Sequence, residues 1–580
     1  MLKKIRLAVS SDFNKGKVFP IIAIFLFSFL LLLPQLVSKG IIAGSDFLFH
    51  YNRFYETAMQ IKTGNYNYFL SLFGFYSSGR IVNALYGPYF AYFQGILVLL
   101  SKNWFTYQLV SRFVLSSIAG LSMYSLLKQF KIKPRTSLLV ALFYITTFSI
   151  QYWTFRQGFS SWGAAIMPWC LIPAIEFIKD KKISIIRLAV SVAIMMQVHM
   201  LSALFLIVAY LPFYLYGFVK STDKKNVFIK GIIAVFLSLL LTANVWGALI
   251  EVGATNNLVE PFVNSKLYIM TVNQKSFYWL ITPIPLLLIM LYQLYFTFKH
   301  WRHFDVTLRV ITGTFFVFFV LSSSVFPWYQ VNKLNLSIVN LIQFPFRFFV
   351  PATILCLVAF ALILERYFDP KWWKLVTLVL VGATAIGLFQ NFSTQNQSIK
   401  EFYTAKYPIK NKKHQFVIGS SEQVRASFYS SDLHDLLNLV AKSTPDYLPS
   451  DVNNTDNKYG LYEDFVLRYT DNFEKSQIEG DLIYSWVGET NEAVNIPAAK
   501  YGHTQLELNG KILTPSNYSL SGIGTFRVQQ QVGKNTLEIS YKVSPWFNYL
   551  LVINLLSWLT IILFGLFLKL KYYKSYKKIS

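Results

Sequence analysis

Cysteine is scarce in this chain of 580 residues: Cys170 and Cys356 are the only two, and both lie in apolar stretches. Neither has a metal-ligating neighbour in the sequence, and two cysteines are too few for a disulfide framework. Charged residues are also scarce, at 14% of the chain, whereas 54% of the residues are hydrophobic and 18% aromatic. This composition excludes an ordinary soluble globular protein and is typical of an integral membrane protein.

Acidic residues are rare outside one region. Of the 28 Asp and Glu residues, 17 lie between residues 392 and 545, where 15 Lys and Arg nearly balance them. The excess of basic residues, which gives a formal net charge of +26, therefore belongs to the hydrophobic part of the chain. Basic loops between apolar segments indicate the cytoplasmic side of a membrane protein, not a nucleic-acid-binding surface.

The motifs of common nucleotide, metal and hydrolase chemistry are missing too. No P-loop, GxGxxG, HExxH, paired CxxC or GxSxG pattern stands where it could function. The basic loops are also too short to hold a nucleotide-binding domain. These absences disfavour an energy-coupled pump and an enzyme that uses a nucleotide sugar inside the cell.

Thirteen apolar runs of roughly spanning length recur along the chain. Two cytoplasmic termini require an even number of crossings, so either the weakest run, at 86–101, is a re-entrant or interfacial segment, or a further crossing lies between residues 38 and 128. The thirteen runs predict an all-α polytopic membrane protein with about 12–14 transmembrane helices. The runs are 18–37, 86–101, 105–127, 137–152, 162–178, 184–199, 201–219, 227–249, 276–297, 306–326, 348–366, 374–391 and 547–568.

The basic loops predict how the chain is oriented in the cell membrane. Lys- and Arg-rich loops at 128–135, 180–183, 220–226, 299–303 and 371–374, together with the basic C-terminal tail, are expected in the cytoplasm, as are both termini. The sequence then divides into three parts, which are a polytopic module at 1–391 with a long first outer loop at 38–85, an extracytoplasmic domain at 392–545, and a last helix with a basic tail at 546–580.

The extracytoplasmic domain is expected to be of the α+β or β-sandwich kind. From about residue 483 its sequence alternates with the period of a strand, in the runs TQLELNGKILT and TFRVQQQVGKNTLEISYK. Period-two runs separated by NG and GKN turns predict a small antiparallel sandwich just before the last helix.

The stretch GSDFLFHYNRFYE (44–56) in the first outer loop holds the first group of candidate site residues. Asp46, His50 and Arg53 fall at i, i+4 and i+7, on one face of a helix. Each also has a structural interpretation: an acid favoured by the helix dipole, an interfacial aromatic ring and a cation that reaches lipid headgroups. Their alignment favours a functional site, with Asp46 as the candidate general base on the outer face.

Three further outer segments supply candidate donors. LIQFPFRFFVPA (341–352) offers Gln343 and Arg347, and Arg156 is the only charge in YWTFRQGFSSWG (152–163). His199 is expected at the apex of a tight hairpin, where a structural role is the alternative, just as a kinked helix start with an anchoring arginine is the alternative for Arg347. Together with Arg53 and Arg80, these residues predict a basic outer vestibule suited to a lipid phosphate or diphosphate.

Several of these motifs, with others along the chain, resemble those of a known protein family. The segments GSDFLFHYNR, FRQG (155–158), QFPFRF (343–348), DYLP (446–449) and the β-rich end with LNGK and GKNTLEISYK resemble the multi-spanning glycosyltransferases of the GT-C type. Within these, the chain looks like the bacterial YfhO-like proteins and those labelled "6-pyruvoyl-tetrahydropterin synthase-related", although nothing here resembles a zinc-dependent pterin enzyme. The likeness covers nearly the full chain through short motifs.

The resemblance implies a membrane glycosyltransferase, and a single carboxylate acting as base predicts inversion at the sugar carbon. The resemblance also implies a polyprenyl-phosphate sugar donor, a cell-envelope glycan or teichoic-acid-type acceptor, and Asp46 as the first-loop acid. Relatives often carry a second acid shortly after the RG of their second motif, but RQGFSSWGA here has none. A divalent cation therefore stays open as a cofactor, and no other is implied. The alternatives are a flippase or transporter of a lipid-linked glycan and a non-catalytic envelope-assembly protein.

Overall fold

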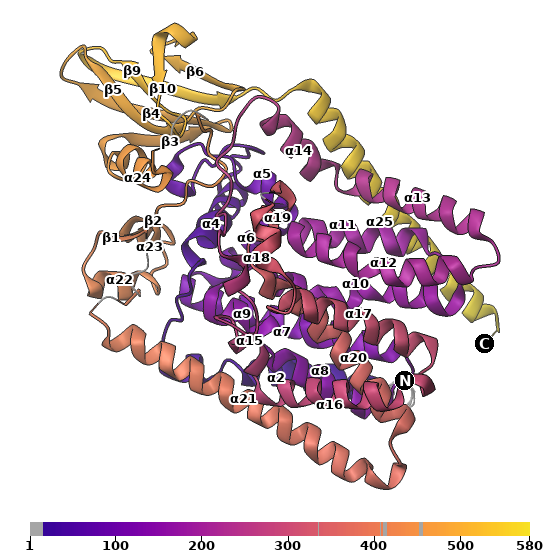
Figure 1. Cartoon of the computed structure of the whole chain (residues 1–580). Coiled ribbons are helices and arrows are strands. Elements are labelled where there is room, and N and C mark those ends of the chain that lie inside the picture. Colours follow the sequence, from indigo (N-terminus) through magenta and orange to yellow (C-terminus); the bar gives the residue numbers. More distant parts are fainter. Residues whose placement is uncertain (1–14, 335, 407, 410–413, 452–455, 580) are drawn as a thin grey trace, which may run out of the picture.

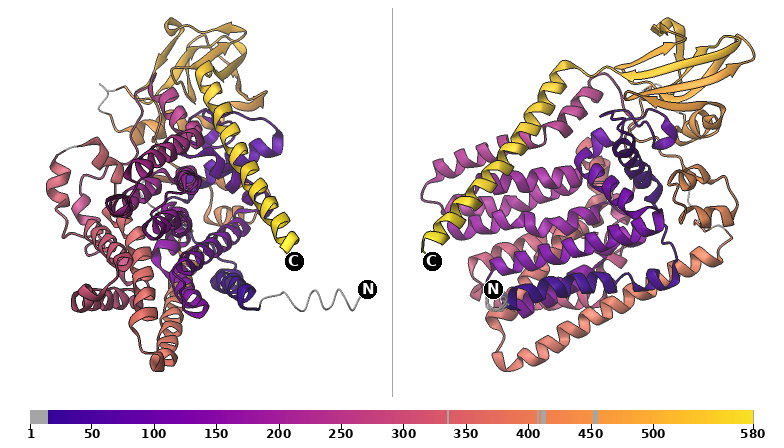
Figure 2. Two further views of the ribbon diagram at one scale, coloured as in Figure 1. Left: turned by 90° about the vertical axis from the view of Figure 1, so that its right-hand side faces the viewer. Right: turned by 180° about the vertical axis from the view of Figure 1, so that it is seen from behind.

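The computed structural model describes residues 15–334, 336–406, 408–409, 414–451 and 456–579. Long helices lie side by side in a bundle, and the strands gather at one end of it (Figure 1). We call this the sheet end of the bundle. The opposite end, where the first described helix begins and the last one finishes, is the tail end, and Figure 2 shows the bundle from two further directions.

The helices of the N-terminal half run from α2 to α14. They are α2 (Lys15–Leu30), α3 (Leu33–Ser38), α4 (Phe47–Thr63), α5 (Asn83–Tyr86), α6 (Pro88–Ser101), α7 (Trp104–Gln129), α8 (Pro134–Thr146), α9 (Phe148–Arg156), α10 (Ser160–Asp180), α11 (Ile185–Val198), α12 (Met200–Lys220), α13 (Lys224–Leu241) and α14 (Ala243–Gly253).

The helices of the second half, up to the start of the C-terminal region, include several short ones at the sheet end. They are α15 (Tyr278–Ile281), α16 (Ile284–His300), α17 (Val306–Ser322), α18 (Trp328–Lys333), α19 (Ser337–Ile342), the 3-10 turn η4 (Pro345–Phe348), α20 (Phe349–Tyr367) and α21 (Trp373–Thr404). The last helix of the chain is α25 (Pro545–Ile579).

Among the described residues, seven helical segments are long and apolar enough to cross a membrane, or eight if α13 and α14, bent by 64°, form one span. Four further apolar helices are shorter, including α6, which occupies the weakest predicted run. The chain is thus mostly helical, and several of the expected 12–14 spans are represented by helices of fewer than 18 residues. Turns and prolines explain the shortening, since Pro34 follows the break between α2 and α3.

The core of the bundle is formed around α20. In the most apolar window of its segment, Pro345–Tyr367, 94% of the residues are buried, and the run is hydrophobic on every side, as a central helix requires. By contrast, only 6% of the corresponding window of α25 is buried, so this helix lies on the outside of the bundle. The apolar surface of α25 faces away from the rest of the protein.

The C-terminal region begins with short elements and ends in two antiparallel sheets. The described elements are β1 (Gln415–Val417), α22 (Ser421–Ser427), α23 (His434–Leu439), β2 (Val440–Lys442), α24 (Lys458–Tyr462), β3 (Glu474–Ile478), β4 (Asp481–Gly488), β5 (Ala493–Ala499), β6 (Thr504–Leu508), β7 (Lys511–Ile512), β8 (Tyr518–Leu520), β9 (Thr525–Gln529) and β10 (Gly533–Tyr541). β1 pairs with β2, and the other strands have the orders β3-β4-β10-β6-β7 and β5-β9-β8.

The two predicted turns have different outcomes. Asn509 and Gly510 both have positive φ, at 51° and 79°, and they join β6 to β7 in the hairpin that an NG pair favours. At GKN, however, Gly533 begins β10 and the chain passes from the three-stranded sheet to the five-stranded one. β9 and β10 are therefore not a hairpin. Alternating burial along β4 and β6 gives each strand one buried face.

The start of the C-terminal region also differs from the expected boundary at residue 392. Helix α21 continues without a break to Thr404, so the first part of the region is helical. The sheets then dock on the first loop: the Tyr484 hydroxyl donates to the Ser77 carbonyl oxygen at 2.9 Å, and the Ala499 amide donates to that of Ser78 at 2.9 Å. The first loop and the C-terminal region consequently meet at the sheet end.

Candidate functional site

Helix α4 places the three residues of the first motif on one face, as the sequence predicts. Asp46 is the N-cap residue, its carbonyl oxygen accepts the His50 amide at 3.2 Å, and Arg53 Nη1 lies 3.4 Å from His50 Nδ1. The neighbouring stripe of Phe47 and Phe54 is fully buried. This apolar stripe fixes the rotation of α4 and, with it, the direction of the polar face.

Arg53 is the most unusual residue of this face. Its side chain is 0% exposed, and it forms no ion pair with any described residue. Its Nε donates to Asn83 Oδ1 at 3.1 Å, its guanidinium lies 4.1 Å from the ring centre of Tyr86, and its Nη2 is buried without a hydrogen-bond partner. Burial lowers the pKa of Arg53 to about 10, which still leaves it cationic at neutral pH.

An uncompensated cation of this kind is costly, because removing a charge from water costs several kcal/mol by order of magnitude. Neutral acceptors and aromatic faces offset only part of this cost, and one N–H group stays unpaired. An anionic ligand at Nη2 would supply both the missing charge and the missing acceptor. The surroundings of Arg53 are therefore those that an anion would complete.

Phe159, which directly follows the FRQG motif, joins the parts of the site. Its ring stacks on His50 at a centroid distance of 4.7 Å, lies 5.2 Å from the Arg53 guanidinium carbon, and meets His199 edge-on at 6.1 Å. No sequence pattern singled out this residue beyond its position after the motif. It forms an apolar wall that keeps Arg53 and both imidazoles away from water.

The FRQG motif itself holds the first loop through its backbone and Gln157. The Asp46 amide donates to the Arg156 carbonyl oxygen at 3.2 Å, and the Gly44 amide donates to Gln157 Oε1. A side chain at Gly44 would collide with the Arg156 backbone, at 2.1 Å from its carbonyl carbon. The Arg156 side chain is exposed. Arg156 thus positions Asp46 by a main-chain contact, and its guanidinium stands outside the buried part of the site.

His199 occupies the predicted hairpin apex, as a single extended residue between α11 and α12. Its Nδ1 lies 2.8 Å from Ser202 Oγ. Burial, reinforced by the charges of Arg347 and Arg53, lowers the pKa of His199 to about 3. Burial and the Arg53 charge also bring the pKa of His50 well below its ordinary value. Both imidazoles are neutral near pH 7, so they offer hydrogen bonds rather than positive charge.

Arg347 approaches the same site from η4. Its Nη1 donates to Gln343 Oε1 at 2.7 Å, and its guanidinium lies 5.0 Å from the Phe344 ring centre. Gln343 is held in turn, since its Nε2 donates to the Phe262 carbonyl oxygen at 2.9 Å. The charge of Arg347 lowers the pKa of both His199 and Tyr86, although burial is the larger influence on each. The two predicted residues therefore act together, with Gln343 orienting Arg347.

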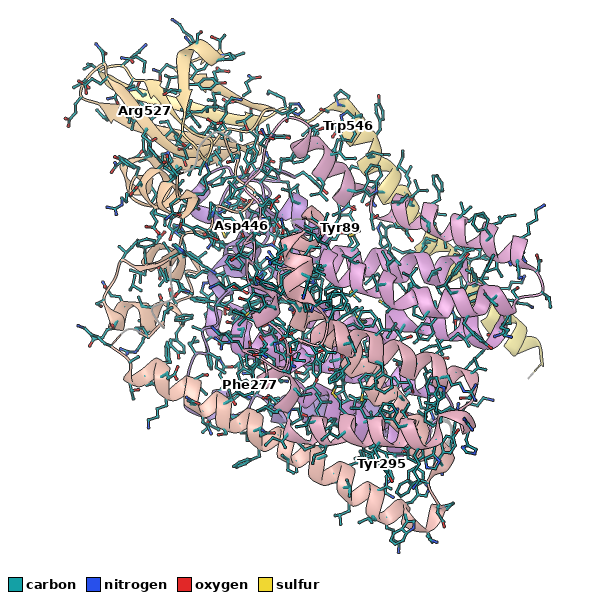
Figure 3. All side chains as sticks on the ribbon, viewed as in Figure 1. Tyr89, Phe277, Tyr295, Asp446, Arg527 and Trp546 are labelled. Carbon is teal, nitrogen blue, oxygen red and sulfur yellow. The ribbon has the colours of Figure 1, made fainter. Side chains whose placement is uncertain are left out.

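The C-terminal region contributes residues that the sequence did not predict for the site. Lys442 Nζ lies 3.6 Å from Asp46 Oδ1 and donates to the Ser45 carbonyl oxygen at 2.8 Å. Asp446 is close enough that the charge of Asp46 contributes to raising its pKa, although burial is the main cause. Figure 3 labels Asp446 where the C-terminal region meets the bundle. The only sequence signal was the short DYLP motif.

Other candidate groups have structural tasks. Arg80 Nη1 and Nη2 donate to the carbonyl oxygens of Thr444 and Asp446, at 2.7 and 2.5 Å, so Arg80 braces the C-terminal region. Glu56 accepts the amides of residues 72–74 and shapes the first loop. Glu251 binds His503 Nδ1 at 2.9 Å. Asp46, by contrast, lies on the same helix face as Arg53 and keeps 42% of its side chain exposed.

Among the described residues, no group of three or more His, Cys, Asp and Glu side chains is placed to hold a metal ion. Asp46 and Asp446 offer two carboxylates that face a common region, which is a smaller donor set than hard cations take in dedicated protein cages. No family model matches the chain, and no curated protein matches it either. The functional argument therefore rests on the geometry of these residues.

Proposed function

We propose that this protein is a polytopic membrane glycosyltransferase of the GT-C type, similar to the YfhO-like proteins. It moves a sugar from a polyprenyl-phosphate donor to a cell-envelope glycan or teichoic-acid-type acceptor on the outer face of the plasma membrane. In this scheme the tail end is cytoplasmic and the sheet end lies outside. The donor's isoprenoid chain lies among the helices.

The observation that carries the proposal is the buried, unpaired Nη2 of Arg53 on the same helix face as an accessible carboxylate, two turns away along α4. Arg53 is 0% exposed and keeps a buried Nη2 without a partner, while Asp46, seven residues earlier on the same face, is 42% exposed. A cation enclosed by aromatic rings fits a phosphate that enters from an apolar side. A carboxylate open to solvent fits a hydroxyl that enters from water.

The enclosed cation and the accessible carboxylate have separate parts in the transfer reaction. The bond between the sugar carbon and the phosphate oxygen breaks, and its electron pair leaves with the phosphate, whose charge Arg53 and Arg347 stabilise. The acceptor hydroxyl attacks the same carbon from the opposite face and gives its proton to Asp46. A single displacement with one carboxylate acting as base inverts the sugar carbon, and no covalent sugar–enzyme intermediate forms.

Support for the orientation comes from charge and position. The loops at the tail end carry the basic residues, and two ion pairs join them there, Lys133 to Glu365 at 3.3 Å and Arg366 to Asp305 at 2.7 Å. A basic excess marks the cytoplasmic side of membrane proteins. All the site residues described above lie at the sheet end, which is the side expected to face the cell envelope.

The test is transfer by purified, reconstituted protein supplied with a polyprenyl-phosphate sugar labelled in the sugar, together with an envelope fraction as acceptor. We expect label to enter the polymer with wild-type protein and not with Asp46→Asn, because removing a general base costs on the order of 10²–10⁴ in rate. Glu260→Gln is the matched control, since Glu260 is an exposed acid predicted for the same side.

Three results would contradict the proposal. Full transfer by Asp46→Asn would remove the assigned base. Translocation of the lipid across vesicles without transfer would identify a flippase instead. Binding of envelope polymer with neither activity would identify an assembly protein. A comparison of envelope glycans in cells with and without the gene then identifies the sugar and the acceptor.

A further inference from the structure

The segment 443–449 crosses the site in a fixed position. On one side, Arg80 donates to the carbonyl oxygens of Thr444 and Asp446. On the other, the Tyr447 amide donates to the Val259 carbonyl oxygen at 2.9 Å, and the Tyr447 carbonyl oxygen accepts the Tyr501 hydroxyl at 3.1 Å. Four contacts within the four residues 444–447 hold the backbone here, so the Asp446 side chain projects from a fixed support.

The carboxylate of Asp446 has no partner on any other residue that the structure describes: its one hydrogen bond is to its own backbone amide, although two cations are near it. Arg80 directs its terminal nitrogens to backbone oxygens, and Lys442 lies against Asp46 and Ser45. No hydrogen bond or ion pair joins the Asp446 carboxylate to another residue that the structure describes. A partly buried acid that is held in place but unpaired is a site for a ligand group that donates a hydrogen bond.

The charges around the site are arranged by sign. The unpaired cation Arg53 and the Gln343-bound Arg347 lie toward the bundle, whereas Asp46 and Asp446 come together where the C-terminal region covers the first loop. Lys442, 3.6 Å from Asp46, offsets part of this negative charge, and the remaining carboxylate oxygens can accept hydrogen bonds from hydroxyl groups. This part of the site therefore fits a neutral polyol or sugar, and the ring of Tyr447, the residue after Asp446, meets Tyr86 edge-on at a centroid distance of 6.4 Å.

We propose that Asp446 is an acceptor-binding residue: its carboxylate accepts a hydrogen bond from an acceptor hydroxyl next to the one that Asp46 deprotonates. The C-terminal region then completes the site as well as covering it. This inference rests on the proposed glycosyltransferase function. It adds that the acceptor group at the reaction centre is an uncharged hydroxyl-bearing unit, bound between the bundle and residues 443–449.

The experiment separates acceptor binding from donor chemistry. Purified full-length protein receives the labelled polyprenyl-phosphate sugar with increasing amounts of the envelope fraction, and label is counted both in the polymer and as free sugar released by water. For Asp446→Asn we expect transfer at low acceptor to fall about 10–100-fold, from the loss of a hydrogen bond to a charged group. Release to water should stay within about twofold of wild type, because water needs no such bond.

Two variants make the result specific. Asp464→Asn is the matched control, because Asp464 is an exposed acid of the same region whose partner is Arg468, four residues along. Asp446→Glu keeps the carboxylate and should recover part of the transfer. Release of label to water also reports that Asp446→Asn is folded, so loss of transfer alone is informative.

The other outcomes are equally decisive. Transfer by Asp446→Asn that matches wild type at every acceptor level overturns the acceptor role and leaves the proposed function standing. An equal loss of transfer and release, in a variant with wild-type thermal stability, places Asp446 in the donor step and also overturns it. If wild-type protein moves no label at all, the glycosyltransferase proposal fails and this inference fails with it.

Discussion

On the helices that the structure describes, two arginines are buried, and their surroundings differ in one decisive respect. Arg112, on α7, directs all three guanidinium nitrogens to neutral oxygen acceptors: Nε to Thr154 Oγ1 at 3.2 Å, Nη2 to the Leu31 carbonyl oxygen at 3.2 Å, and Nη1 to Gln35 Oε1. Arg53, on α4, has one good side-chain acceptor and a buried nitrogen with none. Neither forms an ion pair with a described residue.

The difference separates a structural arginine from a binding one. Arg112 ties α7 to the helices that contribute its three partners, and its hydrogen-bonding capacity is used within the protein. In Arg53, by contrast, Nη2 has no hydrogen-bond acceptor, although the side chain is buried away from water. A lone ionisable residue within a helical span is often interpreted as part of a transport path. The complete set of hydrogen bonds around Arg112 gives it a structural role instead.

The largest expected effect comes from Arg53→Gln. We expect transfer of the labelled sugar to fall on the order of 10²–10³, which is the typical loss when one preorganised donor to the leaving charge is removed. Thermal stability should be unchanged or higher, because the substitution removes an uncompensated buried charge. Activity assays and thermal unfolding in detergent measure the two quantities.

Arg53→Lys sharpens the same point, because lysine keeps the charge but lacks the planar fork. Its activity should lie between wild type and Arg53→Gln. A clear drop in melting temperature for Arg53→Gln, with full activity per folded molecule, would show that Arg53 resembles Arg112 after all.

Arg112→Gln should have the opposite profile. It leaves the acceptors on Thr154, Gln35 and Leu31 short of donors, and each unsatisfied buried group costs about 1–3 kcal/mol. We expect a lower melting temperature, with transfer per folded molecule close to wild type. Unfolding and activity measured on the same preparation check this, and selective loss of activity at unchanged stability would count against a structural role.

The smallest effect concerns His199 and pH. Burial, with Arg347 and Arg53 nearby, lowers the pKa of His199 to about 3, whereas the unfolded chain should titrate near 6.5. Between these values the unfolded state binds the extra proton, so this stability is complete above about pH 6.5 and is lost as the pH falls toward 3.

In His199→Gln this component is missing. We expect the melting temperature of the variant to decrease less between pH 7 and pH 5 than that of wild type. His50 acts in the same direction, so part of the acid sensitivity should stay. Identical pH profiles for the variant and wild type would mean that His199 binds its proton in the folded protein as readily as in the unfolded one.

Local features of the chain were predictable from its sequence, because helix period and turn chemistry act over a few residues. The alignment of Asp46, His50 and Arg53 on α4, the hairpin at His199 and the NG turn at Asn509 all have this origin. Hydropathy also predicted most of the long helices. Run length overestimated several of them, since an apolar run does not show where a bend or a proline ends the helix.

The composition of the site was less predictable, because it depends on contacts between segments far apart in the chain. Asp446 lies 400 residues after Asp46, and no spacing rule joins them. The sequence grouped Arg80 with the anion-binding cations, whereas its two terminal nitrogens donate to the backbone of Thr444 and Asp446 and only its buried Nε lacks a partner. The charge of an arginine is visible in a sequence, but whether its hydrogen bonds are already used is not.

The turn at Phe75–Ser77 has a consequence for how the protein is built. All three residues have left-handed backbone angles, with φ of 53°, 62° and 52°, and each such non-glycine residue costs about 1–2 kcal/mol. Asn52 holds the start of the turn, and Lys475 and Tyr484 reach over from the strands to bind its carbonyl oxygens. A shortened chain without those strands should therefore release the turn to ordinary right-handed geometry. The strands therefore stabilise the conformation of a loop that is synthesised some 400 residues before them.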